Sequence, residues 1–416
     1  MSTIPIRTVR PAPAAADAAD IADVSHYLRP GTLRLPALPP LSLYIHFPWC
    51  VRKCPYCDFN SHEPAGGTGA IPEAEYLAAL RADLEASLPL IWGRRIHSVF
   101  IGGGTPSLIS AAGLDRLLSD VRALLPLEPE CEITLEANPG TVESGRFAAY
   151  RQSGVTRLSI GIQSFDEAQL KRLGRVHDRA QALAAVEEAQ RHFATFNLDL
   201  MYALPEQSLA QAQAEVELAL SLAPPHLSLY QLTLEPNTVF AKYPPPLPDD
   251  DTAAAIHEWI EATMAQAGYR HYEVSAYAQP GHACRHNLNY WHFGDYLGIG
   301  AGAHGKLSFP HRVLRQVRYR QPASYLENAA QGRFVAEATE VPRADLPFEF
   351  MLNALRLNEG FAPALFTERT GLPMSAIESG VSQGVERGLL VREFDRIAPT
   401  DLGRRFLSDA QALFLR

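Results

Sequence analysis

The chain has 416 residues, of which 47% are hydrophobic and 20% are charged, so it carries enough apolar material for a globular core. Its 37 basic and 46 acidic residues give a formal net charge of −9, which argues against a general nucleic-acid-binding protein, because such proteins are usually basic. Only five cysteines are present. That number argues against a secreted disulfide scaffold and favours a cytoplasmic location.

Residues 1–40 differ in composition from the rest of the chain, with 8 Ala and 7 Pro. The segment contains no apolar run typical of a signal peptide, and its aspartates argue against a transit peptide. The whole sequence also lacks a stretch of about 18 apolar residues, the length of a membrane span. We therefore expect a disordered Ala/Pro-rich leader, and a short helix near residues 14–27 that packs on the body is the alternative.

From Leu41 onward, short hydrophobic runs alternate with helical segments. The predicted strands are Leu41–Phe47, His97–Ile101, Glu132–Glu136, Arg157–Ile162, Asn197–Met201 and Leu227–Leu232. They are interpreted as nearly continuous apolar runs, which is typical of parallel strands covered by helices. This pattern predicts an α/β fold, either a barrel-like ring or a doubly wound sheet, whose functional residues lie at the carboxyl ends of the strands.

The rest of the sequence divides into two further segments after a core of residues 41–242. Residues 243–340 begin with a proline-rich linker and continue into an aromatic, glycine-rich region that completes the core. Residues 341–416 show three helices followed by a short strand pair, the pattern of a winged-helix-like domain. Its third predicted helix, Met374–Arg387, carries Glu378 and Glu386 and little basic charge, so we do not expect it to bind DNA.

Three cysteines directly follow the first predicted strand, in the spacing Cys50-x3-Cys54-x2-Cys57. Three thiolates on one tight loop can each hold one iron of a [4Fe-4S] cluster, which leaves the fourth iron free for another ligand. A zinc site is the alternative, with His46 or His62 as its fourth ligand. Cys131 and Cys284 are isolated in the sequence.

The CxxxCxxC motif, with an aromatic residue beside its last cysteine, resembles the radical S-adenosylmethionine (SAM) superfamily. That resemblance implies a partial (β/α)6 barrel and a SAM molecule chelated to the free iron, which reduction of the cluster cleaves to a 5′-deoxyadenosyl radical. The wider stretch from Leu43 through His62 is similar to the branch that contains oxygen-independent coproporphyrinogen III oxidase and the heme chaperone HemW. The resemblance runs from about Leu41 to the C-terminus.

Two positions distinguish between these two relatives. The oxidase has a fourth cysteine two residues after the third, whereas this chain has Phe59. The sequence His286-Asn-Leu-Asn-Tyr-Trp291 resembles the HNxxYW motif of HemW, which is associated with heme binding. Both features favour the chaperone, and the decarboxylating oxidase remains the alternative function.

Several polar residues at strand ends match the positions that hold SAM in this superfamily. By that resemblance we expect SAM to be bound by Tyr44, Gly103, Gly104, Thr105, Glu136, Gln163, Arg175 and Asp199. From the residues alone, a glycine triplet is often only a turn, and a single arginine is usually a surface charge. Asp199 is the exception, because a carboxylate within an apolar strand is costly without a partner.

The resemblance further implies heme as a bound ligand, contacted by His286, Asn287, Tyr290 and Trp291. Histidine is a common axial ligand of heme iron, and aromatic rings supply flat apolar contacts. His282, His292 and His304 lie near the motif and leave the choice of ligand open. Arg312, Arg315, Arg318 and Arg320 are interpreted as a solvated basic face, with contact to the heme propionates as the alternative. The implied partner is a heme-acceptor protein such as a respiratory enzyme, with transient membrane association through that acceptor.

Overall fold

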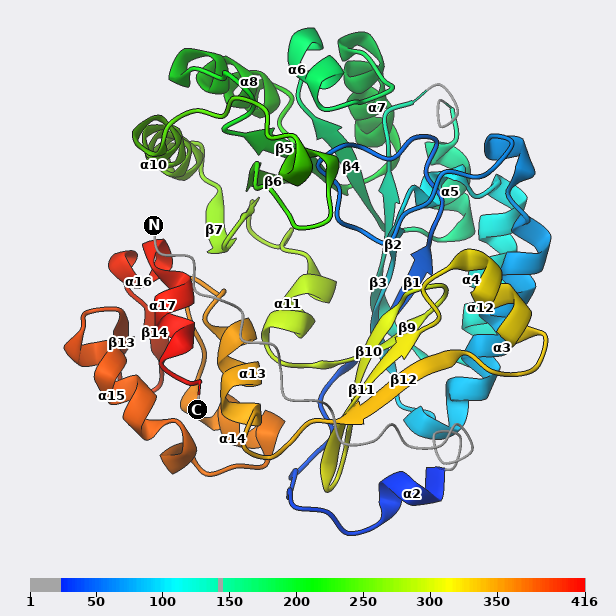
Figure 1. Cartoon of the computed structure of the whole chain (residues 1–416), viewed down its shortest axis with the longest axis vertical. Coiled ribbons are helices and arrows are strands. Elements are labelled where there is room, and N and C mark those ends of the chain that lie inside the picture. Colours follow the sequence, from blue (N-terminus) through cyan, green and yellow to red (C-terminus); the bar gives the residue numbers. More distant parts are fainter. Residues whose placement is uncertain (1–23, 141–144, 416) are drawn as a thin grey trace.

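The computed structural model describes residues 24–140 and 145–415. Six parallel strands form the central part of one 12-stranded sheet, which curves into a partial barrel (Figure 1). These strands are β1 (Leu41–Phe47), β2 (Ile96–Gly103), β3 (Leu127–Ala137), β4 (Arg157–Gln163), β5 (Thr195–Tyr202) and β6 (His226–Gln231). The predicted partial (β/α)6 barrel is confirmed.

Helices between the strands cover the outer face of the barrel (Figure 1). They are α3 (Glu73–Ile91), α4 (Ala111–Leu124), α5 (Phe147–Ser153), α6 (Glu167–Arg172), α7 (Arg179–His192) and α8 (Leu209–Ser221). Side chains that accept hydrogen bonds from free backbone amides fix where several of them begin. Asp178 with Gln181, and Ser208 with Gln211, form capping boxes at the starts of α7 and α8.

The barrel strands alternate between the two faces, which corrects the prediction of continuous apolar runs. Outward-facing side chains such as Leu43, Leu135 and Leu198 are fully buried in the main hydrophobic core. The residues between them face inward and are largely polar; on β4 and β5 they include Ser159, Gln163, Asn197 and Asp199. The sheet is therefore apolar under the helices and polar inside the barrel, because successive side chains of a strand point to opposite faces.

Residues 243–340 extend the sheet at both edges. Strand β9 (Asp295–Ile299) pairs in parallel with β1, and the antiparallel strands β10 (His304–Phe309), β11 (Arg312–Arg318) and β12 (Val335–Glu340) continue from it. Strands β8 (Ala276–Ala278) and β7 (Arg270–Glu273) extend the sheet beyond β6. The remaining helices of this segment are α10 (Asp250–Gln266), α11 (Arg285–Trp291) and α12 (Pro322–Ala329).

The predicted solvated basic face is wrong for Arg312 and Arg318. Arg318 is only 1% exposed and forms an ion pair with Asp83 of α3. Arg312 is buried as well and lies within 3.3 Å of Glu340. Arg312 and Arg318 are thus buried and paired, whereas Arg315 is partly exposed and Arg320, just past β11, is exposed.

The C-terminal segment has its own hydrophobic core, which includes Phe350, Phe366 and Ile397. It contains α13 (Leu346–Ala354), α14 (Pro363–Thr370), α15 (Glu378–Glu386), the hairpin β13 (Leu390–Arg392) and β14 (Ile397–Pro399), α16 (Asp401–Arg405) and α17 (Leu407–Ala412). The three helices and hairpin agree with the predicted winged-helix-like pattern. Helix α11 lies between this domain and the barrel (Figure 1).

The predicted leader is ordered over its second half. Residues 24–40 contain the short helix α2 (Val24–Leu28), and the ring of Tyr27 stacks on Phe309 with 5.2 Å between centroids. Leu33 is buried, and its amide donates to the carbonyl of His311. Disorder is therefore the wrong prediction for residues 24–40, while residues 1–23 lie outside the described residues. None of the described helices has the length and hydropathy of a membrane span.

Candidate SAM and iron–sulfur site

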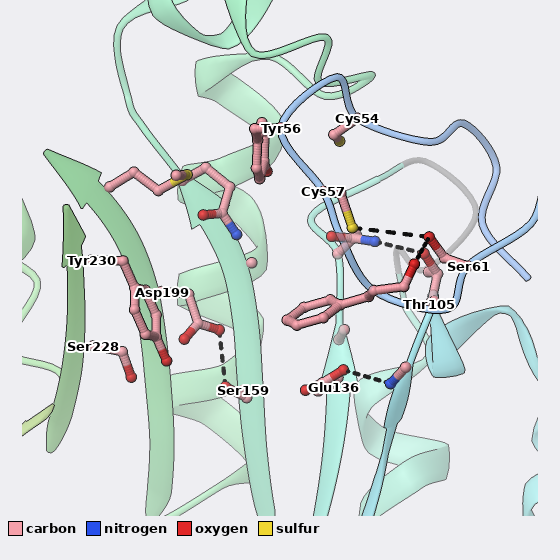
Figure 2. A pocket seen from close by; sticks show the side chains of 18 of the residues that line it. Cys54, Tyr56, Cys57, Ser61, Thr105, Glu136, Ser159, Asp199, Ser228 and Tyr230 are labelled. Atoms are coloured by element: carbon pink, nitrogen blue, oxygen red, sulfur yellow. Dashed lines mark hydrogen bonds between the residues drawn. The ribbon is translucent and has the colours of Figure 1, made fainter. Parts of the chain in front are cut away.

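A cavity of about 480 Å³ opens at the carboxyl ends of the barrel strands and extends into the barrel (Figure 2). The cysteine loop lies at its mouth, and the carboxyl groups of Glu136 and Asp199 face it from β3 and β5. All three cysteines of the loop line this cavity. So do seven of the eight residues expected to hold SAM, namely Gly103, Gly104, Thr105, Glu136, Gln163, Arg175 and Asp199.

Backbone hydrogen bonds hold the cysteine loop between two neighbouring segments. The amide of Cys50 donates to the carbonyl of His62 at 3.0 Å, and the amide of Cys57 donates to that of Cys54 at 3.1 Å. On the other side, the backbone amide of Gly104, in the glycine-rich loop after β2, donates a hydrogen bond to the carbonyl of Phe47 at 2.7 Å. The loop is thus fixed at both ends while its three thiols remain free of disulfide bonds.

The donor set fits an iron–sulfur cluster better than a zinc ion. Both ring nitrogens of His46 are engaged, Nδ1 with the Tyr44 hydroxyl at 2.9 Å and Nε2 with the Asn60 carbonyl at 2.9 Å. Across the described parts of the chain, no three His, Cys, Asp or Glu side chains converge on a point suited to a single metal ion. Three cysteines that each hold a different iron of one cluster need no such convergence.

The glycine-rich loop requires glycine because the chain passes very close to β1. A Cβ atom on Gly104 would lie 2.5 Å from the carbonyl oxygen of Trp49, and one on Gly103 would lie 2.8 Å from that of Phe47. Gly103 also has φ of 121°, a conformation that side chains rarely adopt. These glycines therefore join the end of β2 to the cysteine loop as well as lining the cavity.

Glu136 and Asp199 form an acidic pair in the interior of the barrel. Burial, together with the negative charge of Asp199, raises the pKa of Glu136 to about 8 against the opposing effect of a hydrogen bond from the Gly103 amide. Burial likewise raises the pKa of Asp199, which accepts hydrogen bonds from Ser159 at 2.9 Å and Asn197 at 2.8 Å. A cationic ammonium or a hydroxyl of a ligand would compensate for the cost of these buried acids.

Arg175 is the cavity cation that contacts a sulfur of the cysteine loop. Its guanidinium donates to the Cys54 sulfur at 3.6 Å and to the Gly161 carbonyl at 2.7 Å, and it also contacts the Asn138 amide oxygen. Its Nε is buried and has no hydrogen-bond partner among the described residues. A guanidinium held in this way is positioned to bind a carboxylate beside the cluster.

Tyr44 is the one predicted SAM contact that does not line the cavity. Its ring stacks against Phe100 with 6.3 Å between centroids, and Phe100 in turn lines the cavity. The hydroxyl of Tyr44 is engaged with His46. Tyr44 and Phe100 are register partners on β1 and β2, so Tyr44 lies beside a residue that lines the cavity.

The residues expected to contact heme do not form one surface. His286 is only 7% exposed; its Nδ1 lies 3.1 Å from the Ser98 hydroxyl, and its ring packs on Phe100. Asn287 lines the inner end of the cavity. Tyr290 and Trp291 point toward the other side of α11, where the Tyr290 hydroxyl meets that of Tyr296 at 3.1 Å and Arg356 lies 4.3 Å over the Trp291 ring.

Sequence reasoning missed a second group of cavity residues that lies deeper in the barrel. They are Arg157, Ser159, Asn197, His226, Ser228 and Tyr230. His226 connects Asn197 to Tyr272. Its Nδ1 lies 2.6 Å from the Asn197 amide oxygen, and its Nε2 lies 2.9 Å from the Tyr272 hydroxyl. These cavity residues could have been predicted from the alternation of polar and apolar residues along β4, β5 and β6.

Comparisons with known proteins agree with this architecture. Residues 44–219 match the Radical SAM superfamily, and residues 341–406 match the HemN C-terminal domain. The solved structure of coproporphyrinogen III oxidase (HemN) from Escherichia coli, a radical SAM enzyme, superposes with a TM-score of 0.77 over 91% of this chain and 90% of that one. Its sequence identity is 22%, so this likeness concerns the fold.

Proteins that are more similar in sequence to this chain are named heme chaperone HemW, not coproporphyrinogen III oxidase. The chain is 49% identical over 380 residues to the heme chaperone HemW of Escherichia coli, which is 91% of this chain and 99% of that protein. It is 48% identical to HemW of Haemophilus influenzae over 92% of this chain and 99% of the relative. With HemW of Mycobacterium tuberculosis the identity is 36%, over 92% and 96% of the two chains.

Proposed function

Since the chain belongs to the HemW family of radical SAM proteins, we propose that it is a heme chaperone, which binds heme and delivers it to an acceptor protein. The observation that carries this proposal is 49% identity over 99% of the length of a relative named as a heme chaperone. Similarity at that level extends over the barrel, the α11 segment and the C-terminal domain together.

The cavity supports two further ligands. We assign a [4Fe-4S] cluster to Cys50, Cys54 and Cys57, whose fourth iron stays open for the amino and carboxylate groups of SAM. In this assignment Glu136 and Asp199 bind polar groups of SAM from the strand ends, and Arg175 binds its carboxylate. The buried acids favour a cationic ligand, and the free Nε of Arg175 favours an anionic group nearby.

The competing function is oxygen-independent coproporphyrinogen III oxidase. The likeness to that enzyme rests on fold, at 22% identity. At the position of the oxidase's additional cysteine, this chain has Phe59, which lies at the mouth of the cavity and is 62% exposed. A phenyl ring neither binds iron nor carries a proton, so any step that needs that thiol is lacking here.

We propose only the class of protein that accepts the heme. A protein that delivers heme must release it to a heme-dependent protein, and a respiratory enzyme fits this role. We place the chaperone in the cytoplasm, with any membrane contact made transiently through such an acceptor.

Two measurements on the same preparation test the proposal. Hemin is titrated into anaerobically reconstituted protein, where we expect a saturable shift of the Soret band at one heme per chain. Coproporphyrinogen III is then supplied with SAM and a reductant, where we expect no protoporphyrinogen. Turnover of coproporphyrinogen would establish the competing function, and the absence of a Soret shift would refute the chaperone.

A further inference from the structure

The cavity itself is a poor place for heme. Its volume of about 480 Å³ must contain SAM beside the cluster, and its walls carry many polar groups, including Glu136, Asp199 and Asn197. A porphyrin is a flat, mostly apolar ring that binds against apolar and aromatic side chains. The surface that binds heme is therefore expected outside the cavity.

Exposed hydrophobic side chains are concentrated around the cavity mouth. Of the nine large hydrophobic residues that are exposed in the described part of residues 41–340, Phe59 lines the mouth and five more lie on segments next to residues that line it or pack on the cysteine loop. Phe59 is 62% exposed and Tyr243 is 66% exposed. We call the six residues the apolar collar: Val51, Phe59, Val176, Leu234, Val239 and Tyr243.

The three loops that carry the apolar collar pack on one another. The amide of Phe240 donates to the carbonyl of Pro55 at 3.0 Å, which joins the loop after β6 to the cysteine loop. Gly174, next to the third loop, lies close enough to Pro55 that an added Cβ would meet its ring at 2.8 Å. Beneath them, Leu173 and Leu232 belong to one small buried cluster. The apolar collar therefore rests on a shared platform.

Unpaired cations flank the apolar collar. Arg52 lines the cavity mouth, and Lys53 bonds only backbone carbonyls through its ammonium, at 2.9 and 3.3 Å. Neither side chain forms an ion pair within the described residues. Asp58 and Glu63 lie on the same loop, and Glu63 is engaged with the backbone amide of Lys53. Two cations that have no ion-pair partner among the described residues, beside an apolar surface, complement the two carboxylates of heme.

A groove beside α11 is the rival location. It is lined by Leu288, His292, Phe361, Leu365 and Arg369, and its His97 is already paired with Glu128 at 3.0 Å. Although it offers imidazoles, none of its lining residues is an exposed large hydrophobic side chain. A flat apolar ligand would gain little contact area there.

We propose that heme docks on the apolar collar, over the mouth of the SAM cavity, with its carboxylates toward Arg52 and Lys53. This inference rests on the proposed function and adds the location of the cargo. Heme in this position is bound at an open surface, which suits a ligand that must pass to another protein. It also covers the route by which SAM enters the cavity.

The test uses aspartate substitutions in the full, reconstituted chain. Phe59→Asp and Leu234→Asp should each weaken hemin binding by roughly tenfold or more, the order expected when one large apolar contact is lost. Phe394→Asp is the matched control, because Phe394 lies in the C-terminal hairpin and is 103% exposed. It should bind hemin like the wild type. Iron content and the unfolding midpoint confirm that each variant is folded.

The outcomes separate this inference from the proposed function. If the wild type binds no hemin, the proposed function fails. If the wild type binds hemin and both apolar-collar variants bind it within twofold, the docking site is overturned. Loss of binding in His292→Ala with the apolar-collar variants intact would place heme in the groove instead.

Discussion

The backbone amide of Gly103 donates a 3.0 Å hydrogen bond to a carboxylate oxygen of Glu136, which joins the glycine-rich loop after β2 to the end of β3. Two features that lie more than thirty residues apart in the sequence thus form one wall of the cavity. The pKa of Glu136 is nevertheless raised to about 8, because burial and the charge of Asp199 outweigh this hydrogen bond.

The raised pKa of Glu136 predicts a pH-dependent affinity for SAM. Because the ionised carboxylate is the better acceptor for an ammonium, affinity should rise with pH by up to about tenfold per unit below the pKa and level off above it. With the pKa at about 8, the rise should extend from pH 6 to 8. Isothermal titration with SAM measures it. Glu136→Gln should bind more weakly at pH 8 with a flatter profile, and an unchanged slope would contradict the assignment.

The same group affects stability with the opposite sign. The pKa of Glu136 lies above its ordinary value of 4.5 in the folded chain. The folded state therefore binds the proton more tightly than the unfolded state, and stability falls as pH rises from 4.5 to about 8. Glu136→Gln should lose less stability over this window in denaturant titrations of ligand-free protein.

Replacement of the cluster cysteines should abolish the chromophore. Anaerobic reconstitution of the wild type should give about four irons and four sulfides per chain. Cys50→Ser, Cys54→Ser and Cys57→Ser should each remove the brown absorbance, because each of these cysteines holds a separate iron in the proposed cluster. Cys131→Ser is the control, since Cys131 is buried on β3 away from the cavity lining. Stoichiometric zinc in place of iron would contradict the cluster.

His286 should prove important for stability rather than for direct contact with heme. Its ring is buried on Phe100 and bonded to Ser98, whose hydroxyl also bonds Ser42 at 2.7 Å. His286→Ala should therefore lower the free energy of unfolding by about 1–3 kcal/mol, through a small cavity and the loss of the hydrogen bond to Ser98. Chemical denaturation measures this. A hemin titration that collapses while stability is preserved would restore His286 as the axial ligand.

A buried ion pair should hold the edge of the sheet to α3. Asp83 accepts from Arg318, from the Tyr325 hydroxyl at 2.9 Å and from the Gly300 amide at 3.1 Å. Asp83→Ala should cost about 3–5 kcal/mol of stability, because it leaves a buried guanidinium unpaired. Two residues further along α3, Glu85→Ala removes an exposed pair with Arg81 and should cost at most about 0.5 kcal/mol. Equal effects of the two substitutions would contradict this.

Local patterns in the sequence were sufficient for the alternating strands and helices and for the cysteine loop, whereas the family resemblance selected the barrel over a doubly wound sheet. Each strand–helix unit carries its own hydrophobic pattern, and helix starts such as Asp178 and Ser208 are marked by side chains three residues from their partners. The spacing of Cys50, Cys54 and Cys57 is likewise contained within eight residues. Such features can be predicted from the sequence because they depend on residues that are close together in the chain.

Only the tertiary structure decided which distant residues meet. Nothing in the sequence near Arg318 indicates that Asp83, 235 positions away, neutralises it. In the same way, His286 is the first residue of a motif that predicts a heme contact. The closure of the barrel nevertheless buries its side chain against Ser98, 188 positions away. Burial and pairing of polar groups depend on contacts that form when the sheet closes, and for that reason neither the pKa of Glu136 nor the exposure of Phe59 follows from sequence alone.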